Sequence, residues 1–280
     1  MIFENSSTAQ INLNMEVPYI SFPVLSEVPF LRHGFSTRLG GVSSDIFSTM
    51  NLGNESNVYI DEPANIEENY RRIAGSIGFD PKTIVVSKQV HNTNIRCVDE
   101  KDCGKGLYQP RDYDDVDGLI TNIPNITLVT KYADCVPLFF VDTKKKAIGL
   151  THSGWRGTVK KIGKITVEEL HRHFGSNPED IIAVIGPSIC VDCYEVGDEV
   201  ANEFKNAFPN SQEEILTVKD NGKYLCDLWV ANRNVLLEAG LRPDNIHISS
   251  VCTSCNSDLL FSHRKTEGKR GSLAAFLSIK

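Results

Sequence analysis

The chain has 280 residues, of which 41 % are hydrophobic and 23 % are charged, and its formal net charge is −7. These values are typical of a soluble globular protein and exclude a disordered chain or a coiled coil. Lysine and arginine total 29 against 36 acidic residues, which argues against a broad basic face for nucleic acid.

Apolar spacing and turn residues predict the first elements along the chain. Ile66–Gly78 has apolar residues at helical spacing and ends in glycine, so we expect a helix there. Thr83–Val86 predicts a strand. The apolar segment Thr127–Val141 is interrupted by Ala133-Asp134-Cys135 and by Pro137, which predicts two buried strands on either side of a functional bend. The polar stretch Asp99–Asp117 predicts a long surface loop.

The second half of the chain also mixes strands and helices. We expect strands over Ala147–Thr151, Ile181–Ile185, Ile246–Val251 and Leu273–Ile279, and helices over Thr158–Phe174, Glu195–Phe208 and Asp227–Ala239. Because strands and helices do not alternate regularly, the order favours an α+β fold or an irregular α/β sandwich over a doubly wound sheet. No linker rich in proline, glycine or serine divides the chain, so we expect a single domain over residues 1–280.

The cellular compartment expected for the protein decides how its cysteines are interpreted. No apolar run reaches the roughly 18 residues of a membrane helix, and the polar segment Met1–Gln10 lacks the pattern of a signal peptide. We therefore expect a cytoplasmic protein without membrane partners. In that compartment the eight cysteines are expected as reduced thiols or metal ligands rather than as disulfides.

Three polar segments follow predicted strands, and together they offer His91, Cys135 and His152. Two imidazoles and one thiolate make a three-ligand zinc set that leaves a fourth position for water or substrate. A metal held in this way is typical of a catalytic site and lowers the pKa of a bound water to about 7. The spacing matches no compact zinc motif, so two other interpretations stay open. The three residues are ordinary core side chains, or Cys135 is a nucleophile that a histidine holds as thiolate.

Two Cys-x-x-Cys pairs occur, Cys190/Cys193 and Cys252/Cys255. Such pairs can build a structural zinc site, but the 58 residues between Cys193 and Cys252 far exceed the roughly 15–20 of that pattern. Reduced structural thiols are the favoured interpretation of these four residues.

Candidate anion-binding groups lie in three places. Arg38 stands beside Gly40 and Gly41, whose backbone amides can cradle an anion, and Arg156 and Arg264 are further candidate clamps. The alternative is a plain Gly-Gly turn with solvated arginines. The nucleoside-triphosphate loop, the dinucleotide fingerprint and the paired-cysteine deaminase signature are absent from the sequence.

Eight segments in order resemble the bacterial laccase-domain proteins, also called the multicopper polyphenol oxidase or purine nucleoside phosphorylase family. The resemblance covers Phe30 to Lys280. The segments are His33–Arg38, Gln89–His91, Asp115–Thr121, Ala133–Pro137, His152–Gly157, Gly186–Ile189, Cys193–Gly197 and Leu260–Arg264.

The resemblance implies a single-domain α/β/β/α sandwich with mixed sheets. It also implies a metal held by His91, Cys135 and His152, usually zinc, with copper as the alternative. It implies phosphorolysis of adenosine, inosine and methylthioadenosine, with adenosine deamination as a side activity. Expected partners are a nucleoside and phosphate, and the expected assembly is a monomer or a small homo-oligomer. The candidate catalytic residues are the three ligands and Asp134, and the candidate substrate-binding residues are Arg38, Ser43, Arg156 and Arg264.

Two alternatives come with the resemblance, namely copper-dependent polyphenol oxidation and a hydrolase or binding protein for peptidoglycan precursors. A blue-copper site also uses two histidines and a cysteine, but oxygen reduction normally needs several coppers, and the chain has only seven histidines. The sequence departs from the family pattern at Ser153, where alanine is usual, and at Ser272, where an arginine is usual and Arg270 stands two positions earlier.

Overall fold

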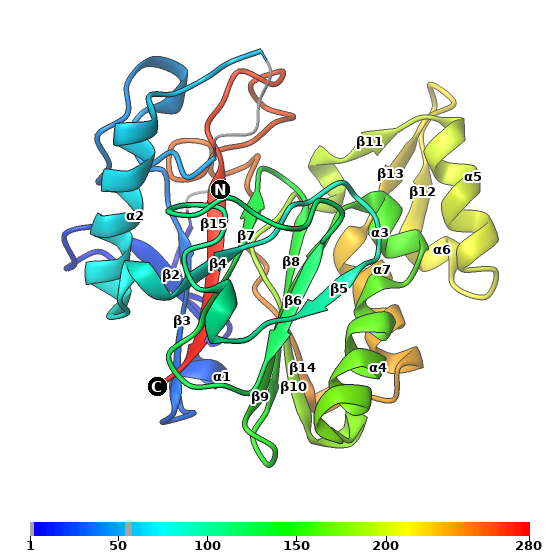
Figure 1. Ribbon diagram of the computed structural model, residues 1–280. Coiled ribbons are helices and arrows are strands. Elements are labelled where there is room, and N and C mark those ends of the chain that lie inside the picture. Colours follow the sequence, from blue (N-terminus) through cyan, green and yellow to red (C-terminus); the bar gives the residue numbers. More distant parts are fainter. Residues whose placement is uncertain (1–2, 54–57) are drawn as a thin grey trace.

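The computed structural model describes residues 3–53 and 58–280, and their strands form three sheets (Figure 1). The first sheet contains, in spatial order, β1 (Gln10–Asn12), β2 (Tyr19–Ser21), β3 (Leu31–Ser36), β15 (Leu273–Ile279), β7 (Thr127–Tyr132) and β4 (Ile84–Val86). The second contains β14 (Ile246–Ile248), β10 (Ile181–Ile185), β8 (Val136–Asp142), β9 (Ala147–Ser153), β6 (Gly118–Thr121) and β5 (Ile95–Cys97). A small third sheet contains β11 (Glu195–Val196), β13 (Tyr224–Cys226) and β12 (Leu216–Val218).

The two large sheets pack face to face, and alternation along their strands explains why. In β15, Ala275 and Leu277 enter the core between the sheets, whereas Phe276 faces the opposite way into the core beside α2 (Pro63–Ile77). In β8, Phe139 joins the core between the sheets and Phe140 joins the core on the helix side. Because successive side chains point to opposite faces and both faces are buried, these strands appear in the sequence as continuous apolar runs.

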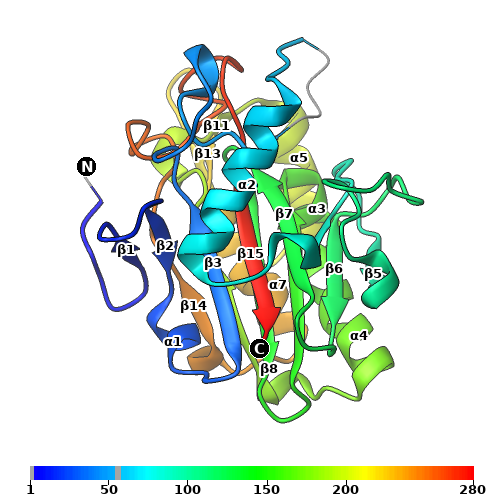
Figure 2. The same ribbon diagram turned by 60° about the vertical axis from the view of Figure 1, so that its left-hand side comes forward.

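Helices cover the outer face of each large sheet (Figure 2). Helix α2 covers the first sheet, and α3 (Trp155–Val159), α4 (Ile162–Phe174) and α7 (Leu228–Glu238) lie against the second. The remaining helices are α1 (Pro23–Ser26), α5 (Asp198–Ala207) and α6 (Gln212–Ile215). The layers are therefore α/β/β/α with mixed sheets, as expected. None of the described helices is long and apolar enough to cross a membrane.

The structure corrects the predicted elements at three places. The helix predicted over Thr158–Phe174 is two helices, because Lys161 adopts a left-handed backbone (φ 59°) that interrupts the hydrogen-bond ladder between α3 and α4. The helix predicted over Glu195–Phe208 begins only at Asp198, because Gly197 is extended and the two residues before it pair as β11. The strand predicted over Ile246–Val251 ends at Ile248.

The bend predicted within Thr127–Val141 is confirmed, and it is the point where the chain passes from one sheet to the other. Strand β7 ends at Tyr132 in the first sheet, and β8 begins at Val136 in the second. Asp134, in the bend, has a left-handed backbone with φ 86°. Strand β15 pairs with both β3 and β7, so the residues just before it lie beside this bend.

Candidate metal centre and pocket

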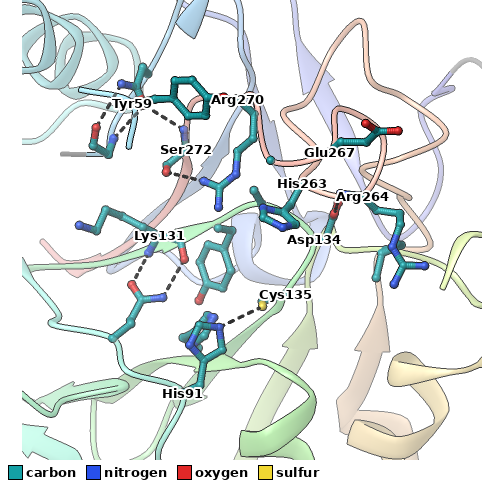
Figure 3. A pocket seen from close by; sticks show the side chains of 18 of the residues that line it. Tyr59, His91, Lys131, Asp134, Cys135, His263, Arg264, Glu267, Arg270 and Ser272 are labelled. Atoms are coloured by element: carbon teal, nitrogen blue, oxygen red, sulfur yellow. Dashed lines mark hydrogen bonds between the residues drawn. The ribbon is translucent and has the colours of Figure 1, made fainter. Parts of the chain in front are cut away.

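Three segments converge on the bend between the two large sheets. Cys135 lies in the bend itself, and His152 on β9 pairs with Pro137 on β8. His91 lies in the loop after β4, which Gln89 fixes by two hydrogen bonds of 2.7 Å to the backbone N–H and C=O of Lys131 (Figure 3). The Gln-Val-His segment thus holds a histidine opposite a cysteine that is 44 residues away in sequence.

The side chains of His91, Cys135 and His152 form one cluster. Their ligand atoms all lie within 4.8 Å of one another, and Nε2 of His91 is 3.9 Å from Sγ of Cys135. The two imidazole rings meet edge to face with centroids 4.8 Å apart. The sequence expectation that these three residues come together therefore agrees with the geometry.

A buried carboxylate orients the cluster. Oδ1 of Asp117 accepts a hydrogen bond of 2.8 Å from Nδ1 of His152, which leaves Nε2 of that ring directed at Cys135. The carboxylate also accepts bonds from the backbone N–H groups of Val90, His91 and Asn92. Burial would raise the pKa of Asp117, but the hydrogen bond and charge of His152 outweigh it and lower the pKa. In the sequence, Asp117 is visible only as a member of the matching segment Asp115–Thr121, with no signal of this role.

The electrostatics of the cluster suit a divalent metal. Burial would raise the pKa of the Cys135 thiol, yet the charge of His152 and the hydrogen bonds of both histidines lower that pKa to about 6. Burial would lower the pKa of His152, whereas the charge of Cys135 and the bond to Asp117 raise it to about 9. Near neutral pH these shifts favour a thiolate at Cys135 and a proton on His152. A bound cation can replace that proton. Cysteine binds metals as thiolate, so the donor set fits zinc.

Gly154 makes room for the cluster. A Cβ at this position would lie 2.8 Å from Cδ2 of His91 and 3.2 Å from Sγ of Cys135. The backbone there is extended (φ −69°, ψ 172°), a conformation open to any residue. Gly154 is thus required for space and not for backbone freedom.

The cluster opens into a cavity of about 750 Å³. Tyr132, Tyr194 and His263 line it together with the candidate ligands. Arg264, Arg270 and Lys131 supply positive charge, which the carboxylates of Asp134 and Glu267 partly offset. In Figure 3 the side chains of Arg270 and His263 point into the same part of the cavity, above Cys135 and His91. A cavity with candidate metal ligands in its wall and several cations is suited to a partly anionic small molecule.

Arg270 is the cation most clearly prepared for a ligand. Its Nη1 donates to Oγ of Ser272 at 3.0 Å and to the C=O of Gly271 at 3.1 Å, whereas its buried Nε has no hydrogen-bond partner among the described residues. Burial lowers the pKa of Arg270 from its usual value. Because Arg270 also lines the cavity, its guanidinium is a natural contact for an anion. The sequence pointed to this region only through the displaced arginine and Ser272.

Arg38 does not line the cavity but connects two segments of the chain by hydrogen bonds. Its guanidinium donates to the backbone C=O groups of Ser48 and Ser257, each at 2.9 Å. The neighbouring Gly41 has no free amide for an anion, because its N–H donates to Oγ1 of Thr49. The amide of Gly41 is thus occupied by an internal hydrogen bond.

Two other candidate substrate-binding residues also lie outside the cavity lining. Oγ of Ser43 donates to Asp61 at 2.6 Å and accepts from Asn69, so it belongs to a buried polar network beneath α2. Arg156 is exposed on α3, with its guanidinium stacked 4.2 Å above the ring of Trp155.

Asp134 and Arg264 do line the cavity, and both are held by other groups. The carboxylate of Asp134 accepts from Oγ1 of Thr253 at 2.6 Å and from the backbone N–H of Arg264 at 2.7 Å. The guanidinium of Arg264 donates to the C=O groups of Glu195 and Cys193. These contacts make Asp134 a support for the cavity wall.

The layered fold thus places a candidate metal centre, the His-Cys-His cluster, at the junction of the two large sheets and at the wall of a cavity. A family model described as "Multi-copper polyphenol oxidoreductase laccase" matches residues 32–280, and the chain belongs to this family. It is 38 % identical over 251 residues to purine nucleoside phosphorylase YlmD of Bacillus subtilis, covering 88 % of each chain.

Two further comparisons agree with the family. Adenosine deaminase RL5, from an unknown prokaryotic organism, is 36 % identical over 234 residues, which are 82 % of this chain and 87 % of the relative. The crystal structure of YfiH from Bacillus licheniformis superposes with a TM-score of 0.90 at 32 % identity, covering 96 % of this chain and 99 % of the other. The chain is therefore an enzyme of this family.

Proposed function

We propose that the chain is a zinc-dependent purine nucleoside phosphorylase. The observation that carries this proposal is the guanidinium of Arg270 in the lining of the same cavity as the His-Cys-His cluster. One wall offers metal ligands, and another offers a buried cationic donor for phosphate. The relatives named purine nucleoside phosphorylase support the reaction class.

The proposed zinc ligands are His91, Cys135 and His152. A zinc ion held by them would supply a Lewis acid at the wall of the cavity. Asp117 keeps the proton of His152 on Nδ1, so that Nε2 is available as a ligand.

Phosphate is proposed to bind Arg270, with Lys131 and Arg264 adding positive charge to the cavity. In phosphorolysis an oxygen of phosphate bonds to C1′ of the ribose while the bond from C1′ to the base breaks. The bonding pair leaves with the base, which takes up a proton from the phosphate or from solvent. The chain contributes by holding the phosphate in line with C1′ and by surrounding the sugar with the cavity walls. Arg38 and Arg156 have no part in this proposal, because neither lines the cavity.

Chromatography of products tests the proposal. The enzyme is incubated with adenosine or inosine, with and without inorganic phosphate, beside Cys135→Ala and the control Cys97→Ala, which removes an exposed thiol outside the cluster. We expect free base only with phosphate, from the wild type and the control but not from Cys135→Ala. Base release that does not need phosphate, or that survives in Cys135→Ala, would refute the proposal.

Adenosine deamination is proposed as a side activity of the same cavity, on the strength of the relative named adenosine deaminase RL5. It would appear in the same experiment as inosine formed from adenosine regardless of phosphate.

Copper-dependent phenol oxidation is the alternative that the family description favours. Five histidines lie outside the His-Cys-His cluster, namely His33, His171, His173, His247 and His263. None of them belongs to either of the groups of three or more metal-ligating side chains found among the described residues. Because coupled copper centres need many histidines, we propose zinc as the native metal. A phenol-oxidation rate that follows copper loading, with an inactive zinc enzyme, would favour the alternative.

A further inference from the structure

We propose a second metal site, in which Cys190, Cys193, Cys252 and Cys255 bind a structural zinc ion. The 58 residues between Cys193 and Cys252 favour reduced structural thiols when the sequence is considered alone. In the fold, however, their four sulfur atoms all lie within 4.8 Å of one another. This group shares no residue with the His-Cys-His cluster, and the proposal does not depend on the phosphorylase activity.

The distances between the sulfurs fit a tetrahedral zinc site. Sγ of Cys255 is 3.5 Å from Sγ of Cys193 and 3.9 Å from Sγ of Cys190. Four sulfurs at about 2.3 Å from one zinc ion stand about 3.8 Å apart, whereas a disulfide needs about 2.05 Å. The observed spacing leaves no room between the sulfurs for the several irons and sulfides of an iron–sulfur cluster.

Backbone groups support a thiolate in this cluster. The N–H groups of Cys190 and Cys255 both donate to Sγ of Cys252, each at 3.3 Å. Such bonds offset part of the negative charge of a metal-bound thiolate and fix its direction. Cys252 is buried, whereas Cys255 is exposed, so an ion can enter from the surface.

The fold explains why so long a gap still yields one site. The N–H of Ser188 donates to the C=O of Val251, and the N–H of Thr253 donates to the C=O of Ser188, both at 3.1 Å. This short bridge aligns the two Cys-x-x-Cys turns. The chain between them forms the small third sheet, helices α5, α6 and α7, and finally β14 of the second sheet, which brings it back beside β10 (Figure 1).

The proposed zinc would hold one wall of the cavity. Thr253, next to Cys252, donates to Asp134, and the N–H of Ile189 donates to the C=O of the same aspartate at 3.0 Å. Tyr194, next to Cys193, lines the cavity. A metal that joins the two cysteine turns therefore fixes the segments that carry these contacts. Its role is to position and stabilise this wall.

The test counts zinc in the full chain. A variant with His91→Ala, Cys135→Ala and His152→Ala removes the first cluster, and we expect it to retain about one zinc per chain. Adding Cys193→Ser and Cys255→Ser should abolish that zinc. Adding Cys97→Ser and Cys103→Ser instead, which removes two thiols outside both clusters, should leave it bound.

X-ray absorption at the zinc edge of the first variant keeps the test decisive if the added cysteine substitutions prevent folding. We expect four sulfur neighbours at about 2.3 Å. A nitrogen or oxygen shell, iron in place of zinc, a disulfide among these cysteines, or zinc that survives their replacement would each overturn the proposal. These readouts use no substrate, so they are independent of the proposed phosphorylase activity.

Discussion

Oδ1 of Asp117 lies 2.8 Å from Nδ1 of His152, and this single contact decides which ring nitrogen of the histidine faces Cys135. Asp117 precedes β6 and His152 lies on β9, two neighbouring strands of the second sheet. The orientation of the proposed ligand is therefore built into the sheet.

We predict that Asp117→Asn weakens metal binding at the His-Cys-His cluster about 10- to 100-fold, because the supporting negative charge is lost. Titration with zinc in competition with a chelator measures the change. Asp112→Asn is the matched control, since that carboxylate is on the surface and outside the cavity. Equal affinities for the two variants would show that Asp117 does not support the metal.

Gly154→Ala should remove the metal from the same cluster while the protein remains folded. The added methyl would press on His91 and Cys135, yet the extended backbone accepts alanine. Gly197→Ala is a close match, because Gly197 also caps a helix with an extended backbone and has open space around it. Metal content and circular dichroism of both variants check the prediction, and a fully loaded Gly154→Ala would contradict it.

Arg270→Gln should raise the KM for phosphate about 10-fold or more, the loss expected for a charge-assisted hydrogen bond. Arg156→Gln, on the exposed face of α3, should leave it unchanged. Initial rates at varied phosphate and fixed nucleoside separate the two. A KM that changes in Arg156→Gln alone would restore the sequence-based assignment of Arg156.

His33 should make stability depend on pH. Burial lowers the pKa of this histidine to about 4, and its Nε2 accepts a hydrogen bond of 2.9 Å from the N–H of Phe22. The folded protein holds the neutral ring. The stability that His33 contributes is therefore complete at pH values above the unfolded pKa of about 6.5. It is lost as the pH falls from about 6.5 towards 4, because the unfolded chain takes up the proton first.

The expected loss is on the order of 3 kcal/mol across that window. His33→Gln keeps an acceptor without the titration, so its free energy of unfolding should fall less over the same range. Denaturant unfolding at several pH values makes the comparison. Parallel curves for the two proteins would argue against a titrating His33.

Much of the architecture was predictable because both large sheets are buried on two faces. The runs around Leu277 and Phe139 identify strands by their apolar residues alone. The bend at Cys135 stood out because polar residues interrupt such a run. Short strands such as β1 and β5 were missed, because their stability comes from neighbouring strands that are distant in sequence.

The candidate site was predictable only in part. His91, Cys135 and His152 share a ligand chemistry, so residue type together with the family resemblance could select them. Arg38 is as polar as Arg270, and only the pairing of β15 with β7 decides which of the two arginines lines the cavity. The two Cys-x-x-Cys pairs were equally hard to connect from sequence. They are far apart along the chain, and only the backbone hydrogen bonds at Ser188 bring their turns together.

Phosphorus NMR of the enzyme with inosine and inorganic phosphate tests the central claim most directly. We predict that the phosphate resonance declines as a sugar monophosphate resonance grows, and that neither changes with Cys135→Ala. Loss of inosine while the phosphate resonance stays constant, or an equal new resonance from Cys135→Ala, would contradict phosphorolysis at this centre.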